Sequence, residues 1–397
     1  MYPASIIPEQ LYTSEEVSEH LRLSLRTIQR LLHTRALVSY KLHGQYRIKG
    51  LDLLNYLDQN RQSHLADLVP SQAPIEMAKM LDVKPISIDF GLDWIPFLQS
   101  TDAEESSELL AQISTGLRHQ LVQELGFIMP GIQMQDDASL PASGFCIKLQ
   151  GVSLIQGELQ PDALYLRKQN PLRHRHLQAV YEFSEHPDAK SGQLHFLDLL
   201  KQVIKSYACE ILSRDEVSVI LERLRPQREV VIDEVLSTDP HSHKLKIGQL
   251  TQILRSLLQE QVSIRNLGLI LELLADALIE TNQLDELVEK TREGLARQIN
   301  APFVNAEQVM DVYGLSPEFE NELMQVIAEQ NLQAQSDCFR RLHHAMNDLP
   351  ENSVLICAPA LRKQIFLNCR RLYPDLHVFS YREIAREYRI QLRKVLL

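Results

Sequence analysis

The chain lacks the short motifs that mark common catalytic and nucleotide-binding sites. Its 397 residues contain no Gly-x-x-x-x-Gly-Lys phosphate loop, no Gly-x-Gly-x-x-Gly, no Gly-x-Ser-x-Gly and no His-Glu-x-x-His. Histidine pairs such as His174 with His176 have no nearby cysteine, whereas a structural zinc site usually needs four ligands. We therefore expect no enzyme activity, no cofactor and no metal site.

Cysteines are few, and long apolar runs are missing. The five cysteines are widely spread without a Cys-x-x-Cys, a pattern typical of idle thiols in a reducing compartment. The most apolar stretch, 267–279, is interrupted by Glu272 and Asp276, so it falls short of the ~18 apolar residues that a membrane helix needs. No signal peptide is apparent. We expect a cytoplasmic protein of two to four domains that is not integrated in a membrane.

Acidic residues are missing from residues 21–50, although the whole chain has a formal net charge of −11. This block carries +7, so the remaining residues carry −18. A positive block on a negative chain indicates that the block alone meets a polyanion. Its basic residues are Arg22, Arg26, Arg30, Arg35, Lys41, Arg47 and Lys49.

The block has the pattern of two short helices. Thr13 and Glu16 form a capping box that predicts a first helix, and Ser24 can cap a second. Apolar residues at 28, 31 and 32 give the second helix a buried face and leave its basic residues outside. This arrangement predicts a helix-turn-helix.

The following residues alternate as a two-stranded wing. Positions 38, 40 and 42 share one face of a strand, positions 46 and 48 share a face of the next, and His43-Gly44 forms the turn. A third helix around 51–59 closes the small core. The segments "YTSEEVSEHL", "SLRTIQRLL" and "HGQYRI" resemble the excisionase-like, MerR-related winged-helix modules over roughly residues 9–62.

The resemblance implies that double-stranded DNA is the partner, with the second helix in the major groove. The residues expected to contact base edges are Arg26, Thr27, Gln29 and Arg30. Those expected to contact phosphates or to lie on the wing are Arg22, Lys41, His43, Gln45, Arg47 and Lys49. The alternative is that the same small unit binds protein or is purely structural.

Residues 63–82 read as a linker, and a mixed α/β pattern follows from residue 83. Alternation predicts strands in "ISIDF", "FIMPGIQMQDD" and "GFCIKLQGVSLIQGEL", and helical spacing predicts a helix over 107–125. Two apolar stripes, at 250–258 and 267–278, predict a helical hairpin with Asn266 as a cap. A final unit reads strand, helix, strand, helix.

Several long segments resemble the cytoplasmic half of the large export-gate family of flagellar and virulence type III secretion. They include "LVQELGFIMPGIQMQDD", "LTQILRSLLQEQVSIRNLGLILELLADAL" and "VLICAPALRKQIFLNCRRLYPDLHVFSYREI", in the family's order, over roughly residues 83–397. The resemblance implies an α/β subdomain at 83–214 with an insertion at about 167–192, a helical ring-building subdomain at 215–300, and an α/β subdomain at 301–397. It also implies that Arg265 holds the corner between two helices rather than touching a substrate.

The sequence departs from this family in two places. The basic block stands where the family has its membrane half, and the insertion is reduced to a short polar stretch. We therefore expect an α+β multidomain protein that binds DNA and links transcription to type III secretion, as a homo-oligomer. The alternative is an accessory of the export apparatus that binds gate subunits or chaperones, with its N-terminal unit used for protein contacts.

Overall fold

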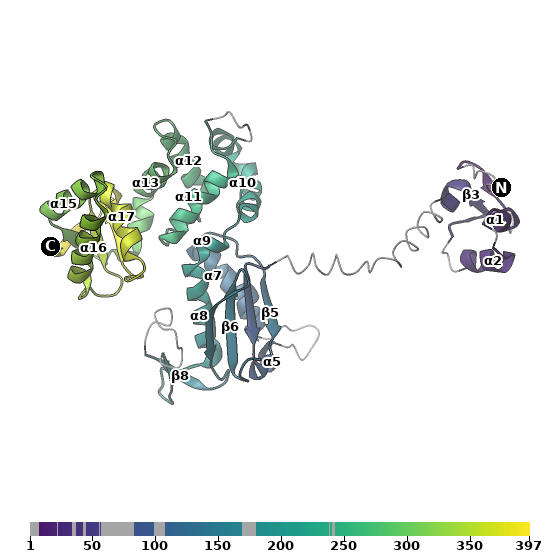
Figure 1. Ribbon diagram of the computed structural model, residues 1–397, viewed down its shortest axis with the longest axis horizontal. Helices are drawn as coiled ribbons and strands as arrows, with labels where there is room; N and C mark the ends of the chain where they lie inside the picture. The colour runs from purple at the N-terminus through teal and green to yellow at the C-terminus, as the bar shows by residue number, and fades with distance from the viewer. Residues whose placement is uncertain are drawn as a thin grey trace. The chain divides into compact units, whose positions relative to one another are not determined.

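The computed structural model describes residues 8–21, 23–33, 37–42, 45–54, 56, 83–98, 108–168, 180–237, 239 and 243–397. The chain divides into two compact units, residues 1–83 and 84–397. The residues outside the described ranges are drawn as a thin grey trace in Figure 1.

The N-terminal unit has short helices and a small sheet around one core. The predicted capping box is confirmed, since Thr13 N donates to Glu16 Oε2 at 2.8 Å and Glu16 N donates to Thr13 Oγ1 at 3.2 Å. The core contains Val17, Ile28 and Ile48, each fully buried. The helices are α1 (Ser14–Leu21) and α2 (Leu25–His33), and the strands, in sheet order β1-β3-β2, are β1 (Leu11–Tyr12), β2 (Tyr40–Leu42) and β3 (Gln45–Lys49). His43-Gly44, the predicted turn, lies outside the described residues.

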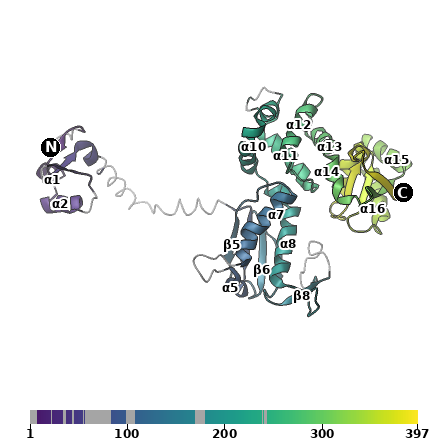
Figure 2. The ribbon, with the colours of Figure 1, turned by 180° about the vertical axis from the view of Figure 1, so that it is seen from behind.

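The second unit begins with a mixed sheet, which we call the first subdomain (84–211). Its strands, in sheet order β5-β4-β6-β7, are β4 (Ile86–Phe90), β5 (Ile132–Asp136), β6 (Gly144–Leu149) and β7 (Val152–Glu158). Helices α7 (Leu117–Glu124) and α8 (Gly192–Ser206) cover one face of the sheet, as the opposite views of Figures 1 and 2 show. The helix predicted over 107–125 consists of α6 (Glu108–Ala111), a π-helical turn (Gln112–Gly116) and α7.

The reduced insertion forms a separate small sheet. Its strands, in sheet order β10-β8-β9, are β8 (Leu164–Arg167), β9 (Tyr181–Phe183) and β10 (Lys190–Ser191), and residues 169–179 lie outside the described part. Buried His195 on α8 forms a 2.9 Å hydrogen bond between its Nε2 and Tyr165 O. This bond ties the small sheet to the helix that follows it.

The helical subdomain (213–300) confirms both predicted apolar helices and the Asn266 cap, whose Oδ1 accepts a hydrogen bond from Leu269 N at 3.4 Å. Its helices are α10 (Arg214–Val235), α11 (Ile247–Gln259), α12 (Leu267–Leu278), α13 (Leu284–Gly294) and α14 (Ala296–Asn300). The prediction that these two helices form a hairpin with each other is not what the structure shows. Helix α12 packs mainly against α10 and α13, whereas α11 packs against α13 and α9 (Ala208–Ile211). The apolar stripes thus form a layered core rather than a two-helix unit.

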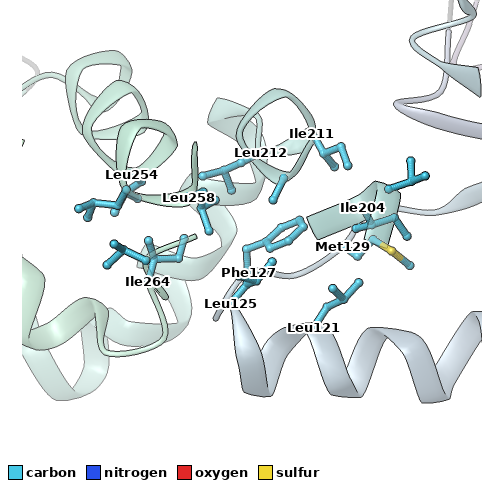
Figure 3. Close-up of a cluster of buried hydrophobic side chains, with 14 of the residues drawn as sticks. Leu121, Leu125, Phe127, Met129, Ile204, Ile211, Leu212, Leu254, Leu258 and Ile264 are labelled. Carbon is cyan, nitrogen blue, oxygen red and sulfur yellow. The ribbon is translucent and has the colours of Figure 1, made fainter. Parts of the chain in front are cut away.

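The first and helical subdomains share one continuous apolar core. Figure 3 shows Leu125 and Phe127 of the first subdomain pointing toward Leu258 and Ile264 of the helical subdomain. All four side chains are at most 3% exposed. Burying such side chains together is worth ~1.5–3 kcal/mol each, so these subdomains fold as one body.

The C-terminal subdomain (301–397) contains a four-stranded parallel sheet. Its strands, in sheet order β13-β12-β11-β14, are β11 (Val309–Leu315), β12 (Val354–Cys357), β13 (His377–Ser380) and β14 (Arg389–Leu396). Its helices are α15 (Pro317–Ala328), α16 (Leu332–Met346) and α17 (Pro359–Cys369). The predicted last helix is only the 3₁₀ turn η6 (Tyr381–Glu383), and β14 was not predicted.

None of the helices in the described ranges combines the length and apolar composition that a bilayer crossing requires.

Gly126 allows a close backbone contact between the first and helical subdomains. Its φ is +80°, and a Cβ built there would lie 2.0 Å from Arg265 N. Next to it, Ile264 N donates to Leu125 O at 2.8 Å. Only glycine fits here, because any side chain would collide with backbone atoms that cannot rotate away.

We expect Gly126→Ala to lower the free energy of unfolding by about 2 kcal/mol or more, because the left-handed backbone disfavours a Cβ and the contact must open. Urea denaturation followed by circular dichroism measures this. Gly116→Ala is the matched control, since its φ is −62° and no atom lies within 4 Å of its added Cβ. Equal losses in the two variants would contradict this role for Gly126.

Candidate functional site

A cavity of about 760 Å³ lies where the first, helical and C-terminal subdomains meet. Its position follows from the Gly126 contact, which brings the end of α7 against the corner between α11 and α12. Its lining residues are Gln123, Glu124, Lys205, Glu260, Gln261, Val262, Ser263, Arg265, Asn266, Arg292, Gln298, Ile299, Pro302, Phe303, His377 and Phe379.

Aromatic rings form one wall of the cavity. The Phe303 ring lies 4.4 Å from the His377 ring and 5.4 Å from the Phe379 ring, measured between centroids. Burial lowers the pKa of His377 below its usual value. The imidazole is therefore neutral at pH 7 and contributes to an apolar surface.

Charged residues line the rim on the side of the first subdomain. The Glu124 carboxylate forms ion pairs with Lys201 at 2.6 Å and with Lys205 at 2.7 Å, and these pairs join α7 to α8. Desolvation raises the pKa of Glu124, but the two lysine hydrogen bonds outweigh it, so the pKa lies below its usual value. These three charges hold one another in place, and Glu124 and Lys205 form a mixed-charge edge of the cavity.

Arg265 lies at the corner between α11 and α12, where the sequence places it. Its backbone holds this corner through the close approach to Gly126. Its side chain is exposed and lines the cavity. The backbone thus has the structural role expected of this residue, and the guanidinium adds a positive charge to the rim.

Two arginines are buried in the wall between the helical and C-terminal subdomains. Arg292 Nε donates to Glu383 Oε1 at 2.5 Å, and Arg292 Nη1 lies 3.2 Å from Glu260 Oε2. The Arg292 and Glu383 side chains are 2% and 0% exposed. Glu383 Oε2 also accepts a hydrogen bond from Ser380 N at 2.6 Å, which fixes η6.

The second buried arginine, Arg362 on α17, bridges two carboxylates. It donates to Glu289 Oε2 at 2.6 Å and to Glu260 Oε1 at 3.0 Å, and both carboxylates receive a second bond from its fork. Burial lowers the pKa of Arg362, but its hydrogen bonds to the carboxylates of Glu289 and Glu260 and their negative charge outweigh this and raise the pKa above its usual value. Glu260 is therefore shared by Arg292 and Arg362, and it links α11 to both.

This arrangement suits binding. An aromatic wall, a rim of both charge signs and rigid ion pairs behind them can hold a polypeptide side chain or a short segment. Within the described residues, no group of three or more His, Cys, Asp or Glu side chains could hold a metal ion.

The residues predicted to contact base edges lie on α2 in the N-terminal unit. Arg26 and Gln29 are exposed, whereas the Thr27 hydroxyl is 2.8 Å from Ser24 Oγ in the cap of its own helix. The Arg30 side chain lies outside the described part.

The predicted phosphate and wing residues are only partly placed. Lys49 is half-buried and pairs with Glu9 at 3.0 Å, and Arg47 Nη1 donates to Tyr46 O at 3.0 Å. The bond to Glu9 is the main cause that raises the pKa of Lys49. Arg22 and His43 lie outside the described residues, as do the side chains of Lys41 and Gln45.

Known proteins match most of the chain. The FHIPEP family matches residues 36–389. The flagellar biosynthesis protein FlhA of Bacillus subtilis (strain 168) is 26% identical, over 82% of this chain and 51% of the relative. The chain belongs to the FHIPEP family. It spans about half the length of the curated relatives it matches.

Solved structures share the fold of this FHIPEP chain. In the complex of Chlamydia pneumoniae CdsV and CdsO, one chain aligns with a TM-score of 0.69 and 22% identity, over 79% of this chain and 98% of that one. The nonameric EscV cytosolic domain from the type III secretion system aligns with a TM-score of 0.63 and 17% identity, over 79% and 97%. At these identities the matches show the fold.

The prediction that this chain is a DNA-binding regulator is wrong. Relatives of the chain are named as flagellar biosynthesis proteins, an aligned structure belongs to a type III secretion system, and the family match begins at residue 36, inside the N-terminal unit. The predicted family boundary at residue 83 was therefore too late. No comparison supports a winged helix-turn-helix. The DNA contacts of the ten residues rested on that function, and we do not propose them further.

The sequence did not predict this cavity, and it singled out two of the lining residues, Arg265 and Asn266, only for structural roles. Arg292 and Phe303 lie about 75 residues or more before His377, and the resemblance of the segment that contains His377 to the family did not indicate a cavity. The segment "VSIRN" was the one signal, because it marks a corner between two apolar helices.

We expect Arg362→Met to destabilise the second unit by about 3 kcal/mol or more, because it leaves the carboxylates of Glu260 and Glu289 without their buried cation. Urea denaturation and limited proteolysis between α14 and β11 measure the effect. Lys290→Ala is the control, because the Lys290–Glu280 pair is exposed, and we expect no measurable change. Equal stability of both variants would show that the buried pairs do not hold the subdomains.

Proposed function

We propose that this FHIPEP chain works in a flagellar or type III export apparatus by binding gate subunits or their chaperones. The observation that carries the proposal is the extent of the match. The family matches residues 36–389, and the structural alignments cover 97–98% of the two aligned chains. The proposed activity is binding rather than catalysis, and the proposed location is the cytoplasm.

The N-terminal unit is proposed to make protein contacts. It exposes Leu11 and Tyr40 at 47% and 50%, and these side chains suit an interface with protein better than one with phosphates. Its Lys49 already pairs with Glu9. Acidic Glu15 and Glu19 on α1 lie in the same small unit as the basic residues of α2, so its charge is mixed.

A homo-oligomer is also proposed. EscV is described as nonameric, and the helical subdomain of this chain exposes Ile279 at 85% and Val230 at 83%. These are the two most exposed large apolar side chains of the described residues. Val230 lies on α10, and Ile279 directly follows α12, which packs against α10. A contact between copies would remove them from water.

The binding proposal predicts co-purification with a gate subunit of the same cell. Tagged full-length chain is captured from cells under gentle conditions, and the retained gate protein is measured by immunoblot. Arg26→Ala should leave retention unchanged, because the proposed contact needs no DNA. Retention that depends on nuclease-sensitive nucleic acid, or no retained gate subunit, would overturn the proposal.

The oligomer proposal predicts a particle several times heavier than the 45.6 kDa chain in size-exclusion chromatography with light scattering. Val230→Glu combined with Ile279→Glu should lower that mass, because it places charges in the contact. Leu372→Glu is the control, because Leu372 is 57% exposed but lies in the C-terminal subdomain. A monomeric mass for the unaltered chain at micromolar concentration would contradict the proposal.

A further inference from the structure

The edge strand β14 is unusually open for a strand of a parallel sheet. It pairs in parallel with β11 on one side, and it has no strand on its other side within the described residues. Seven of its eight residues are exposed. Strand edges with this openness can pair with another chain.

One face of β14 carries an apolar stripe. Ile390 and Leu392 are in register with Met310 and Val312 of β11, and residues in register point to the same face of a sheet. Met310 and Val312 are fully buried, whereas Ile390 and Leu392 are 44% and 51% exposed. Val395, at 48%, continues the stripe opposite Gly314. The core-facing side of the sheet therefore extends to the open edge without a cover.

The backbone of β14 can accept another strand. Arg389 N donates to Gln308 O at 2.9 Å, so Arg389 faces the β11 side. Backbone groups alternate sides along a strand, so the N–H and C=O groups of Ile390 and Leu392 point outward. Paired addition of an extended segment would satisfy them.

The other face of β14 is basic. Arg389 and Lys394 lie on it, Arg393 is paired with Asp311 at 2.6 Å, and the strand contains no acid. Helix α16, which packs against β14, exposes Arg340, which is paired with Asp337 at 2.8 Å. Pairing with β14 of a second copy would set cations against cations, which is unfavourable.

We propose that the β14 edge binds an extended segment of a partner protein in which apolar and acidic residues alternate. Its apolar side chains would continue the stripe of Ile390 and Leu392, and its acidic side chains would meet Arg389 and Lys394. The β14 edge would bind such a segment whether or not the chain docks on an export gate.

The test uses labelled synthetic peptides of about ten residues, long enough for one strand. One alternates valine with glutamate, a second alternates valine with lysine, and a third has the composition of the first in two blocks. Fluorescence anisotropy with the full-length chain should show binding of the acidic alternating peptide that is stronger than that of either other peptide by about tenfold or more.

Ile390→Pro should weaken this binding by about tenfold, because it removes an outward N–H while the bonds to β11 remain. Ile390→Ala keeps the N–H group and should weaken peptide binding less than Ile390→Pro does. Arg389→Glu with Lys394→Glu should shift preference to the lysine peptide, which gives a gain that misfolding cannot mimic. Leu372→Ala is the control outside the strand.

Three results would overturn the proposal. The first is equal binding of the acidic and basic peptides, and the second is binding of the acidic peptide to the Ile390→Pro variant that is as strong as to the unaltered chain. The third is a dimer of the unaltered chain that the Ile390→Pro substitution dissociates. The last result would make a second copy the occupant of the edge.

Discussion

The second unit depends on two buried arginines that share one glutamate. Glu260, the residue that follows α11, forms ion pairs with both Arg292 and Arg362. Arg292 also pairs with Glu383, and Arg362 also pairs with Glu289. Buried charges are stable only when they are paired and hydrogen-bonded, so this set tolerates one arrangement of the subdomains. The orientation of the C-terminal sheet follows from it, and so do the aromatic wall of the cavity and the direction in which β14 lies open.

A different kind of contact joins the first and helical subdomains. There the interface is apolar and continuous, and it includes a close backbone contact that only a glycine at position 126 permits. An apolar interface resists dissociation but is not strongly directional, whereas paired charges are directional. The cavity lies where the two kinds of contact meet, with Glu260 and Arg265 on its lining.

Membership in the FHIPEP family changes the meaning of the basic N-terminal block. The charge pattern is real, and the capping box forms as the residues predict, yet the family match runs into this unit from residue 36. A basic helix next to a hairpin is a local feature that small protein-binding units also have. The ion pair between Lys49 and Glu9 neutralises part of the positive charge of the block with a residue that precedes it.

The sequence by itself determined the features that depend on neighbouring residues. Apolar periodicity located α11 and α12, alternation located β4 to β7, and the Asn266 and Thr13 caps formed where expected, because these signals act within a few turns of chain. Only the tertiary structure decided that α12 packs on α10 and α13, that Arg362 is buried 102 residues away from Glu260, and that "RIQLRKVL" is a strand. The physical reason is that each of these features depends on residues far away in the sequence. An arginine is stable in a core, and a cationic segment is stable as an edge strand, only when a distant part of the chain supplies the partner.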